Sequence, residues 1–485
     1  MTMRCVLASF VLLAGFAISQ EAGSTNFPLT VSADARYLQE SDGTPFPILG
    51  RSYWGIIGLS PANYQAAIND AVAKGFNAIE FRAPNGSWQD NFVPFNGAGQ
   101  LPFTTKLGGG AYTGSGSPSE TPDFTTPNEP YWQFLDTFIA YCASKGIAVL
   151  WFPAYVGYGS DGDGWMLAMV NNGASRMRTY GAYVANRYKN YGNIIWMVGG
   201  DKGAQNNPFV GSEITVERAL IDGLKSVAGQ STQFAAEWDS DTTGSSEPNF
   251  GGDLTLNSSY SWEGETATWC RAGYTSSPVK PTFLIEEPYD EEGSDGTQRN
   301  SSATQPVRRF IWWGLLNGIG GYMAGNGYLI HFLNGYASHF DSPGQIDLAH
   351  LNTLYKSISW YQLVPSGLAG MKTLITAGSG GIGSNTYVAS AAAPNGTLLL
   401  AYASPNGTAS RSFTVDMTAM HAASRARWFN PTSGSYSDIA SSLPNTGTRA
   451  FTTPGNNGRN DNDWVLVLDT GDVKTPNPPT NLTVE

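Results

Sequence analysis

The stretch from Asn193 to Asp201, NIIWMVGGD, constrains the fold most strongly. Its five strand-forming residues, Ile194 to Val198, run without a polar side chain, which is typical of a strand buried on both faces. In a β/α barrel the functional groups lie at the carboxyl ends of such strands, and this strand ends at an acid, Asp201. Gly199 and Gly200 would let the backbone and a ligand come close to that carboxylate. Asp201 is therefore a candidate functional residue, with the capping of a turn as the alternative.

An alternation of strands and helices surrounds this stretch. Strands are predicted over 45–58, 76–84, 147–157, 193–201, 234–238, 253–262, 281–289 and 318–327. Helices are predicted over 61–75, 128–146, 175–192, 213–227, 307–318 and 347–360. The pattern predicts an α/β fold, an eight-stranded β/α (TIM) barrel over 28–365. A doubly wound open sheet is the alternative, but a Gly-x-Gly-x-x-Gly phosphate loop does not follow the first strand.

The pattern changes after residue 365. Short strands separated by Pro-Asn-Gly turns follow, which predicts a C-terminal antiparallel β-sandwich over 366–470. A proline-rich tail occupies 471–485. The chain is thus expected to contain two domains in sequence.

The first residues and the net charge indicate the compartment and the class of partner. An apolar run from Cys5 to Ile18 has the length of a signal-peptide core and is too short to span a bilayer. A signal peptide over 1–19 predicts a secreted, extracellular protein. No later segment is apolar for the roughly 18 residues that a membrane helix requires. The formal charge of −12 argues against nucleic acid and anionic membranes as partners, and a monomer is expected.

Cysteines and sequons add little to this prediction. Without the signal peptide only Cys142 and Cys270 remain, and whether they form a disulfide is open. Neither a zinc-ligand pattern nor a GxSxG elbow is present, so no metal or cofactor is expected. Sequons that could carry N-glycans in a eukaryotic secretory route occur at Asn85, Asn257, Asn300, Asn395, Asn406 and Asn481.

Carboxylates near the ends of the predicted strands are the most informative polar residues. They are Glu80, Asp201, Glu237, Glu263, Glu286 and Glu287. Hydrolysis of a glycosidic bond takes two carboxyl groups on opposite sides of the anomeric carbon. The fourth and seventh strands lie across a closed barrel from each other, which favours Asp201 and Glu287 as that pair. Glu286 and Glu287 point to opposite sides of their strand, so only one can face the barrel mouth.

Aromatic residues at or beyond the strand ends could stack against sugar rings. Together with two acids they form the predicted substrate-binding set, which is Trp54, Trp88, Tyr155, Glu237, Trp262, Tyr289 and Glu286. Trp88 and Trp262, which lie beside polar residues, are the better candidates for substrate contact. Trp151 and Trp196 lie among apolar neighbours and are expected in the core.

Several segments, taken in order, resemble the apiosidase-like glycoside hydrolases, in which a barrel precedes a small β-sandwich once labelled a collagen-binding domain. The matching segments are AKGFNAIEF, NEPYWQFLDTFIAYCASKGI, YGNIIWMVGGDKG, EEPYDEE, VRRFIWWGLLNGIGGYMAGNG, WFNPTSG and DWVLVL. The resemblance implies a retaining mechanism with Asp201 as acid/base and Glu287 as nucleophile, and Glu286 as the alternative nucleophile. The best-known activity of the family releases apiose, a branched furanose, from pectic side chains.

The chain departs from the family at three places. Arg51 replaces an acid of the first strand, Glu237-Trp238 replace a histidine at the end of the fifth, and Ser258 to Ser261 replace a Gln-Ser-Gly-His-like segment. The favoured hypothesis is a secreted retaining glycoside hydrolase acting on plant or microbial polysaccharide or oligosaccharide. The alternative is a non-catalytic carbohydrate-binding protein, which an ion pair from Arg51 to a catalytic acid would favour.

Overall fold

The computed structural model describes residues 25–85, 94–114, 120–158, 164–204, 207–261, 265–292 and 305–471. The predicted signal peptide, all but the first residue of the predicted tail, and the predicted sugar-contacting residues Trp88 and Trp262 lie outside these ranges. The predictions made for them are therefore untested.

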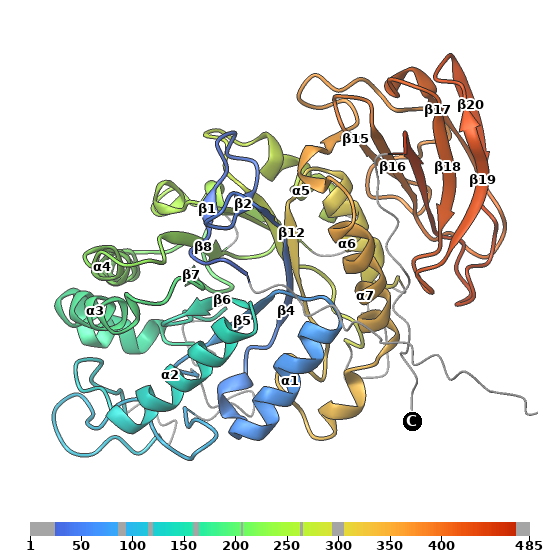
Figure 1. Ribbon diagram of the computed structural model, residues 1–485. Helices are drawn as coiled ribbons and strands as arrows, with labels where there is room; N and C mark the ends of the chain where they lie inside the picture. Colours follow the sequence, from blue (N-terminus) through green and yellow to red (C-terminus); the bar gives the residue numbers. More distant parts are fainter. Residues whose placement is uncertain are drawn as a thin grey trace, which may run out of the picture.

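Eight parallel strands form a barrel, as the sequence predicts (Figure 1). They are β4 (Ile48–Ser52), β5 (Ala78–Arg82), β6 (Ala148–Phe152), β7 (Ile194–Gly199), β8 (Gln233–Glu237), β10 (Asn257–Tyr260), β11 (Thr282–Glu286) and β12 (Gly321–Ala324). A two-residue strand, β9 (Thr242–Thr243), pairs antiparallel with β10. The ring closes between β8 and β10, where the Leu256 N–H donates to the Phe234 carbonyl at 3.0 Å and the Ser258 hydroxyl donates to the Ala236 carbonyl.

The helices surround the barrel (Figure 1). Their bounds are α1 (Pro61–Ala73), α2 (Glu129–Ser144), α3 (Met166–Tyr188), α4 (Ser212–Lys225), α5 (Thr266–Thr275), α6 (Val307–Leu316) and α7 (Pro343–Lys356). Between β8 and β10 the chain forms β9 and two short 3-10 turns, η2 (Gly244–Ser246) and η3 (Gly251–Asp253). α3 starts well before the predicted 175–192 and contains one non-helical residue, Gly173. The predicted strand over 253–262 is only Asn257–Tyr260.

Strand β7 shows why the barrel strands read as continuous apolar runs. Ile195 and Met197 belong to the cluster that fills the barrel, whereas Ile194, Trp196 and Val198 belong to the cluster beneath the helices. Both faces of the strand are therefore buried, as the sequence indicates. Trp151 is fully buried in the outer cluster beside Trp196, which confirms its predicted place in the core.

A small antiparallel sheet lies at the N-terminal end of the barrel. It consists of β1 (Thr30–Val31), β2 (Leu38–Gln39) and β3 (Pro45–Phe46). Leu29, Leu38 and Phe46 pack into the same apolar cluster as the inward side chains of the barrel strands. This end is thus closed by apolar side chains, which leaves the opposite end for a site.

The C-terminal domain is built of antiparallel strands in two sheets, as predicted. The larger sheet contains β13 (Val364–Pro365), β15 (Val388–Ala392), β16 (Leu398–Ala403), β18 (Ser424–Phe429), β19 (Tyr436–Leu443) and β21 (Trp464–Asp469), and the smaller contains β14 (Ile375–Ala377), β17 (Ser412–Asp416) and β20 (Thr448–Thr452). A separate apolar cluster lies between the sheets. The domain packs beside α6 and α7 (Figure 1).

One buried arginine joins the two domains. Arg308 on α6 pairs with Asp347 of α7 at 2.7 Å, and with Asp461 and Asp463, which precede β21, at 2.6 and 2.8 Å. Trp312 stacks on Tyr402 of β16 in the next turn of the same helix. α6 therefore serves both as a barrel helix and as the platform for the sandwich.

Two smaller questions from the sequence are answered here. Cys142 in α2 and Cys270 in α5 are both buried and form no disulfide. The sequons at Asn85 and Asn257 have buried asparagines, which cannot accept a glycan in the folded chain.

Among the described helices, no span has the length and apolar character needed to cross a bilayer.

We predict that Arg308→Ala lowers the free energy of unfolding by about 3–5 kcal/mol, because it leaves buried carboxylates without their cation. The control is Arg178→Ala, which removes an ion pair with Asp222 whose arginine is 56% exposed, and which should cost at most about 1 kcal/mol. Urea unfolding followed by tryptophan fluorescence measures both. Equal losses in the two variants would contradict the role assigned to Arg308.

Candidate active site

The turn after β7 places Asp201 at the mouth of the barrel. Gly199, Gly200 and Asp201 have φ values of 78°, 123° and 49°, all in the left-handed region. The two glycines adopt it without steric cost, and aspartate is among the few other residues that tolerate it. A side chain at Gly200 would also collide with the ring of Tyr155. The glycines are thus required both for the turn and for the contact between Tyr155 and Asp201.

A bulge in β11 decides which of the two adjacent glutamates faces the barrel. Ser259 of β10 pairs with Leu284, but the next residue, Tyr260, pairs with Glu286, so Ile285 is an extra residue. Because a bulge interrupts the strict alternation of side chains, Ile285 belongs to the barrel interior and Glu286 also faces inward. The sequence alone did not reveal this change of register.

Three carboxylates meet at the barrel mouth. One oxygen from each of Asp201, Glu237 and Glu286 lies within 4.8 Å of the others. They come from the ends of β7, β8 and β11, and Glu237 and Glu286 are buried. The structure therefore brings together Asp201, Glu237 and Glu286 of the predicted site residues.

Glu287, the predicted partner of Asp201, lies in a different environment. Burial raises the pKa of its carboxyl group well above the usual value. A hydrogen bond from the Gly325 N–H lowers that pKa, and the charges of Glu80 and Glu292 raise it further. The charge of Glu287 in turn acts on Cys270 of α5 and on Tyr322 of β12, which belong to the outer cluster. The geometry that the sequence assigned to Glu287 is thus held by Glu286, because the bulge at Ile285 shifts the inward position by one residue.

Glu80 of β5 extends the acidic group toward the barrel interior. The Ser52 hydroxyl donates to its carboxylate at 2.6 Å, and Glu237 shares a hydrogen bond with it. Burial raises the pKa of Glu237 well above its usual value, and the charges of the neighbouring acids raise it further. Burial also raises the pKa of Glu80, but its hydrogen bonds and the charge of Arg82 oppose that shift. Glu237 is therefore the proton donor of this pair.

Two tyrosine hydroxyls hold the other carboxylates. Tyr155 donates to Asp201 at 2.5 Å, and Tyr289 donates to Glu286. Burial and the charge of Asp201 raise the pKa of Glu286 well above the usual value, while the hydrogen bond from Tyr289 lowers it. Tyr155 and Tyr289, predicted as surfaces for sugar stacking, therefore also orient the acids.

Trp54 and Arg82 form the wall beside these acids. The guanidinium of Arg82 lies 3.6 Å from the Trp54 ring centroid and 3.4 Å from that of Tyr155. His331 packs edge-on against Trp54, with ring centroids 5.8 Å apart, and lines an adjoining hollow of about 400 Å³. Burial and the charge of Arg82 lower the pKa of His331 to about 3, so the ring is neutral at higher pH.

Arg82 and His331 are site residues that the sequence analysis did not name, and Glu80 was named only as one of the carboxylates near strand ends. A signal for Glu80 and Arg82 was present, because Ala78, Glu80 and Arg82 alternate along β5 and must share one face. Ala78 belongs to the barrel interior, which fixes that face. His331 lies in the segment after β12, where no periodic pattern marks its direction.

Arg51 does not approach the acids. Its guanidinium donates at 2.6 Å to Asp70 on α1 and to the Tyr53 hydroxyl, on the helix-facing side of the barrel. The ion pair that would have favoured a non-catalytic protein is therefore replaced by a structural contact between β4 and α1.

The three clustered carboxylates could also serve as ligands for a hard divalent cation, since such ions prefer carboxylate oxygens. The partners around them are instead mainly proton donors: the hydroxyls of Tyr155 and Tyr289, and the protonated Glu237. Hydroxyl donors of this kind stabilise carboxylates by charge-assisted hydrogen bonds. The arrangement fits acids that share protons.

Comparison with protein families gives two matches. Residues 32–362 match the model described as "Apiosidase-like, catalytic domain", and residues 381–469 match the one described as "Putative collagen-binding domain of a collagenase". The first match contains the whole barrel and each of the acids described above. No protein with a curated function matches the chain.

Solved structures share the fold of both domains. A chain described as a glycoside hydrolase superimposes with a TM-score of 0.72 at 19% identity, covering 93% of this chain and 99% of that one. A glycoside hydrolase of family 5 from Bacteroides vulgatus gives 0.70 at 18% identity, covering 92% and 95%. At these identities the likeness establishes the fold, a glycoside hydrolase barrel followed by a β-rich domain.

A buried acid on α4 supports the strand that carries Asp201. The Gly199 N–H donates to the Glu217 carboxylate at 3.1 Å, and the second oxygen of Glu217 has no hydrogen-bond partner among the described residues. Burial raises the pKa of Glu217 from 4.5 to about 7. The protonated form is thus the one that the fold accommodates.

We predict a pH dependence of stability that Glu217→Gln removes. Between pH 4.5 and about 7 the unfolded chain has lost this proton and the folded chain retains it, so stability falls as pH rises. The unfolding free energy of the wild type, minus that of Glu217→Gln, should fall by about 3 kcal/mol across this window. Urea titrations at a series of pH values measure it, and a constant difference would contradict the assignment.

Proposed function

Because the chain belongs to the apiosidase-like family of glycoside hydrolases, we propose that it is a retaining glycosidase with Asp201 as acid/base and Glu286 as nucleophile. Asp201 follows the fourth strand of the barrel, β7, and Glu286 is the last residue of the seventh, β11. Catalytic groups of barrel enzymes lie at these carboxyl ends. Glu286, rather than Glu287, takes the role of nucleophile because it faces Asp201.

The spacing of the two acids is the observation that carries the proposal. An oxygen of Asp201 lies within 4.8 Å of one of Glu286. Retaining glycosidases separate their carboxyl groups by about 5–5.5 Å, whereas inverting ones need about 6.5–9.5 Å to admit a water between them. The short separation supports direct attack by a carboxylate.

The first step forms a glycosyl-enzyme. A carboxylate oxygen of Glu286 attacks the anomeric carbon, and the bond from that carbon to the leaving oxygen breaks. The leaving oxygen takes the proton of Asp201, which becomes a carboxylate. In the second step a water gives its proton to Asp201 and attacks the anomeric carbon, which releases Glu286.

The neighbouring groups support this division of protons. Glu286 and Asp201 are too close for both to be ionised at low cost. Burial and the charge of Asp201 raise the pKa of Glu286, and the hydroxyl of Tyr289 opposes that shift. A proton on Asp201 removes its charge and so favours the ionised form of Glu286. Asp201 is the more accessible of the two, so it can reach a leaving group that departs toward solvent. Glu237 donates its single proton to Glu80, so its other oxygen can accept a hydrogen bond from a sugar hydroxyl.

The proposed substrate is a plant or microbial polysaccharide or oligosaccharide, including a furanoside in pectic side chains, met outside the cell. Tyr289 is half-buried and offers aromatic surface at the barrel mouth, where the buried rings of Trp54 and Tyr155 lie against Arg82. The non-catalytic alternative loses its main argument, because Arg51 pairs with Asp70 instead of an acid at the mouth. An intact and oriented pair of acids favours the enzyme.

We predict that Glu286→Gln lowers kcat at least about a thousandfold, because the amide cannot form the glycosyl-enzyme. Glu287→Gln, which changes the adjacent buried glutamate, should keep kcat within about tenfold and is the matched control. The measurement is reducing-sugar release from a panel of rhamnogalacturonan, arabinan and other plant and microbial glycans. The opposite order of the two variants would reassign the nucleophile to Glu287.

Asp201→Ala tests the acid/base and the stereochemistry. Its kcat should fall by about 10²–10⁴, the usual contribution of a general acid. Azide attacks without a general base, so it should restore turnover and give a glycosyl azide of retained configuration by NMR. A product of inverted configuration, or no turnover of any glycan by the wild type, would overturn the proposal.

A further inference from the structure

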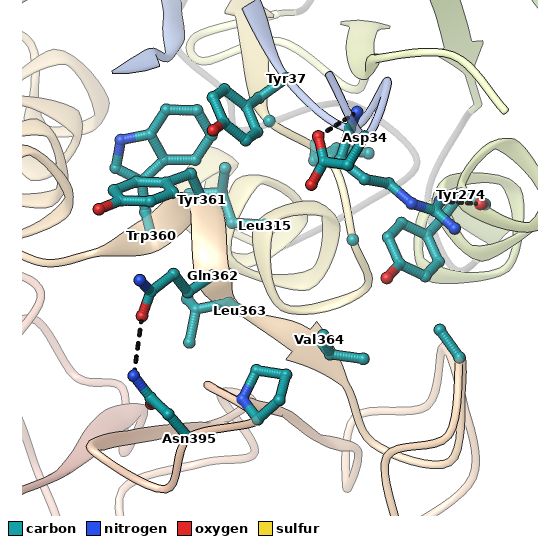
Figure 2. Close-up of a pocket in the computed structure, with 16 residues that line it drawn as sticks. Asp34, Tyr37, Tyr274, Leu315, Trp360, Tyr361, Gln362, Leu363, Val364 and Asn395 are labelled. Atoms are coloured by element: carbon teal, nitrogen blue, oxygen red, sulfur yellow. Dashed lines mark hydrogen bonds between the residues drawn. The ribbon is translucent and has the colours of Figure 1, made fainter. Parts of the chain in front are cut away.

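A groove lies between the N-terminal end of the barrel and the sandwich. It has a volume of about 560 Å³ and is lined by η6 (Trp360–Gln362), the glycines before β12, and the turn between β15 and β16 (Figure 2). The carboxylates of the active site lie at the other end of the strands. A ligand in this groove therefore cannot reach them.

Three aromatic rings gather on one side of the groove, as Figure 2 shows. Tyr37 packs against Trp360 and Tyr361 with ring centroids 5.9 and 5.4 Å apart, and Trp360 and Tyr361 lie 6.0 Å apart. Trp360 is buried and fixed by stacking on Tyr355, whereas Tyr37 and Tyr361 are half-buried. The result is a rigid aromatic surface that is partly open to solvent.

Neutral polar groups lie next to these rings (Figure 2). The Asn395 amide donates to the Gln362 side chain at 3.4 Å, at the long limit of a hydrogen bond, so either group can exchange that partner for a ligand hydroxyl. Partial burial and the charge of Asp34 raise the pKa of Tyr37, whose hydroxyl therefore stays a donor. Amides and hydroxyls beside aromatic faces match a sugar, which presents hydroxyls at its rim and C–H groups on its faces.

The charged residues of the groove do not favour an anionic ligand. Arg36 lies over the ring of Tyr274 at 4.0 Å and donates to its carbonyl at 2.6 Å. Asp34, which is exposed, adds a negative charge to the same wall. A phosphate or a uronate would therefore meet an arginine that already binds Tyr274 and be repelled by the negative charge of Asp34.

We propose that this groove binds a neutral polysaccharide chain at a distance from the catalytic acids, and so anchors the enzyme on its polymeric substrate. The aromatic surface of Tyr37, Trp360 and Tyr361 stacks the sugar rings, and Gln362 and Asn395 bind their hydroxyls. The inference rests on the proposed function for the identity of the polymer as a substrate. Binding itself does not depend on turnover.

Affinity electrophoresis in gels containing arabinan tests the groove, with Glu286→Gln as the parent so that no polymer is cleaved. Adding Tyr361→Ala should weaken arabinan binding about tenfold, the size expected for one lost aromatic contact. Tyr361→Phe, which keeps the ring, should bind as the parent does. Tyr141→Ala is the matched control, because this half-buried tyrosine on α2 packs against Tyr64 far from both sites.

Hydrogen–deuterium exchange locates the effect. An arabino-oligosaccharide should protect the peptides that contain Trp360–Gln362 and Asn395 in the parent, and Tyr361→Ala should abolish that protection. No protection there, or an equal loss of binding in Tyr141→Ala, would overturn the proposal.

The protein is made in a bacterial host, which leaves the exposed sequon at Asn395 without a glycan. Arabinan binding that disappears when a eukaryotic host glycosylates Asn395, with the same peptides protected by that glycan, would assign the groove to the protein's own glycan and overturn it.

The outcomes separate this inference from the proposed function. Sugar release by the wild type without protection of the groove would leave the glycosidase standing and reject the anchor. Binding that depends on Tyr361, with no turnover of any glycan, would support the groove and reject the enzyme.

Discussion

Several carboxyl groups are buried at one place, and the other residues of the site are arranged to offset the energetic cost of that burial. Each ionised carboxylate loses several kcal/mol of hydration when it is buried, and its neighbours add repulsion (on the order of several kcal/mol). Glu80, Glu237 and Glu286 are all buried, with Asp201 beside them. The protein compensates with a proton shared between Glu80 and Glu237, with hydroxyl donors, and with the guanidinium of Arg82. The proposed mechanism needs one acid protonated and another ionised, and these contacts are present in the chain without a substrate.

The barrel supplies the positions that this arrangement needs. Strands buried on both faces hold the backbone rigidly, and Asp201, Glu237 and Glu286 lie where their strands end. Beyond the strands, buried charges fix the layers that surround them. Glu217 binds the end of β7 from α4, and Arg308 ties α6 and α7 to the sandwich. The sandwich contacts the barrel along α6 and α7, so it supports the scaffold and leaves the mouth to the barrel loops.

Much of this could be predicted from the sequence, because the signals were local. Apolar runs ending in glycine and an acid marked β7, and turn-separated short strands marked the sandwich. The choice between Glu286 and Glu287 could not be predicted, since a bulge depends on the pairing of β11 with β10 and leaves no mark on periodicity. The pairing of Arg308 with Asp463 could not be predicted either, because Asp463 lies in the C-terminal domain, far along the chain. Arg51 looked like a change in the site but faces α1, a direction that only the fold fixes.

Membership of the family does not determine which sugar this chain binds, because a residue beside the acids differs from the family's pattern. The resemblance places a histidine where this chain has Glu237. An imidazole there would offer a donor without adding an acid, whereas Glu237 brings a further carboxyl group into a buried cluster. That group is tolerated because protonated Glu237 donates a hydrogen bond to Glu80 and Arg82 offsets the charge of Glu80. Glu80, Arg82 and Glu237 therefore form one electrostatic unit on the wall beside Asp201 and Glu286. In the proposed mechanism Asp201 and Glu286 carry out the reaction, and Glu237 is a position at which this chain departs from the family.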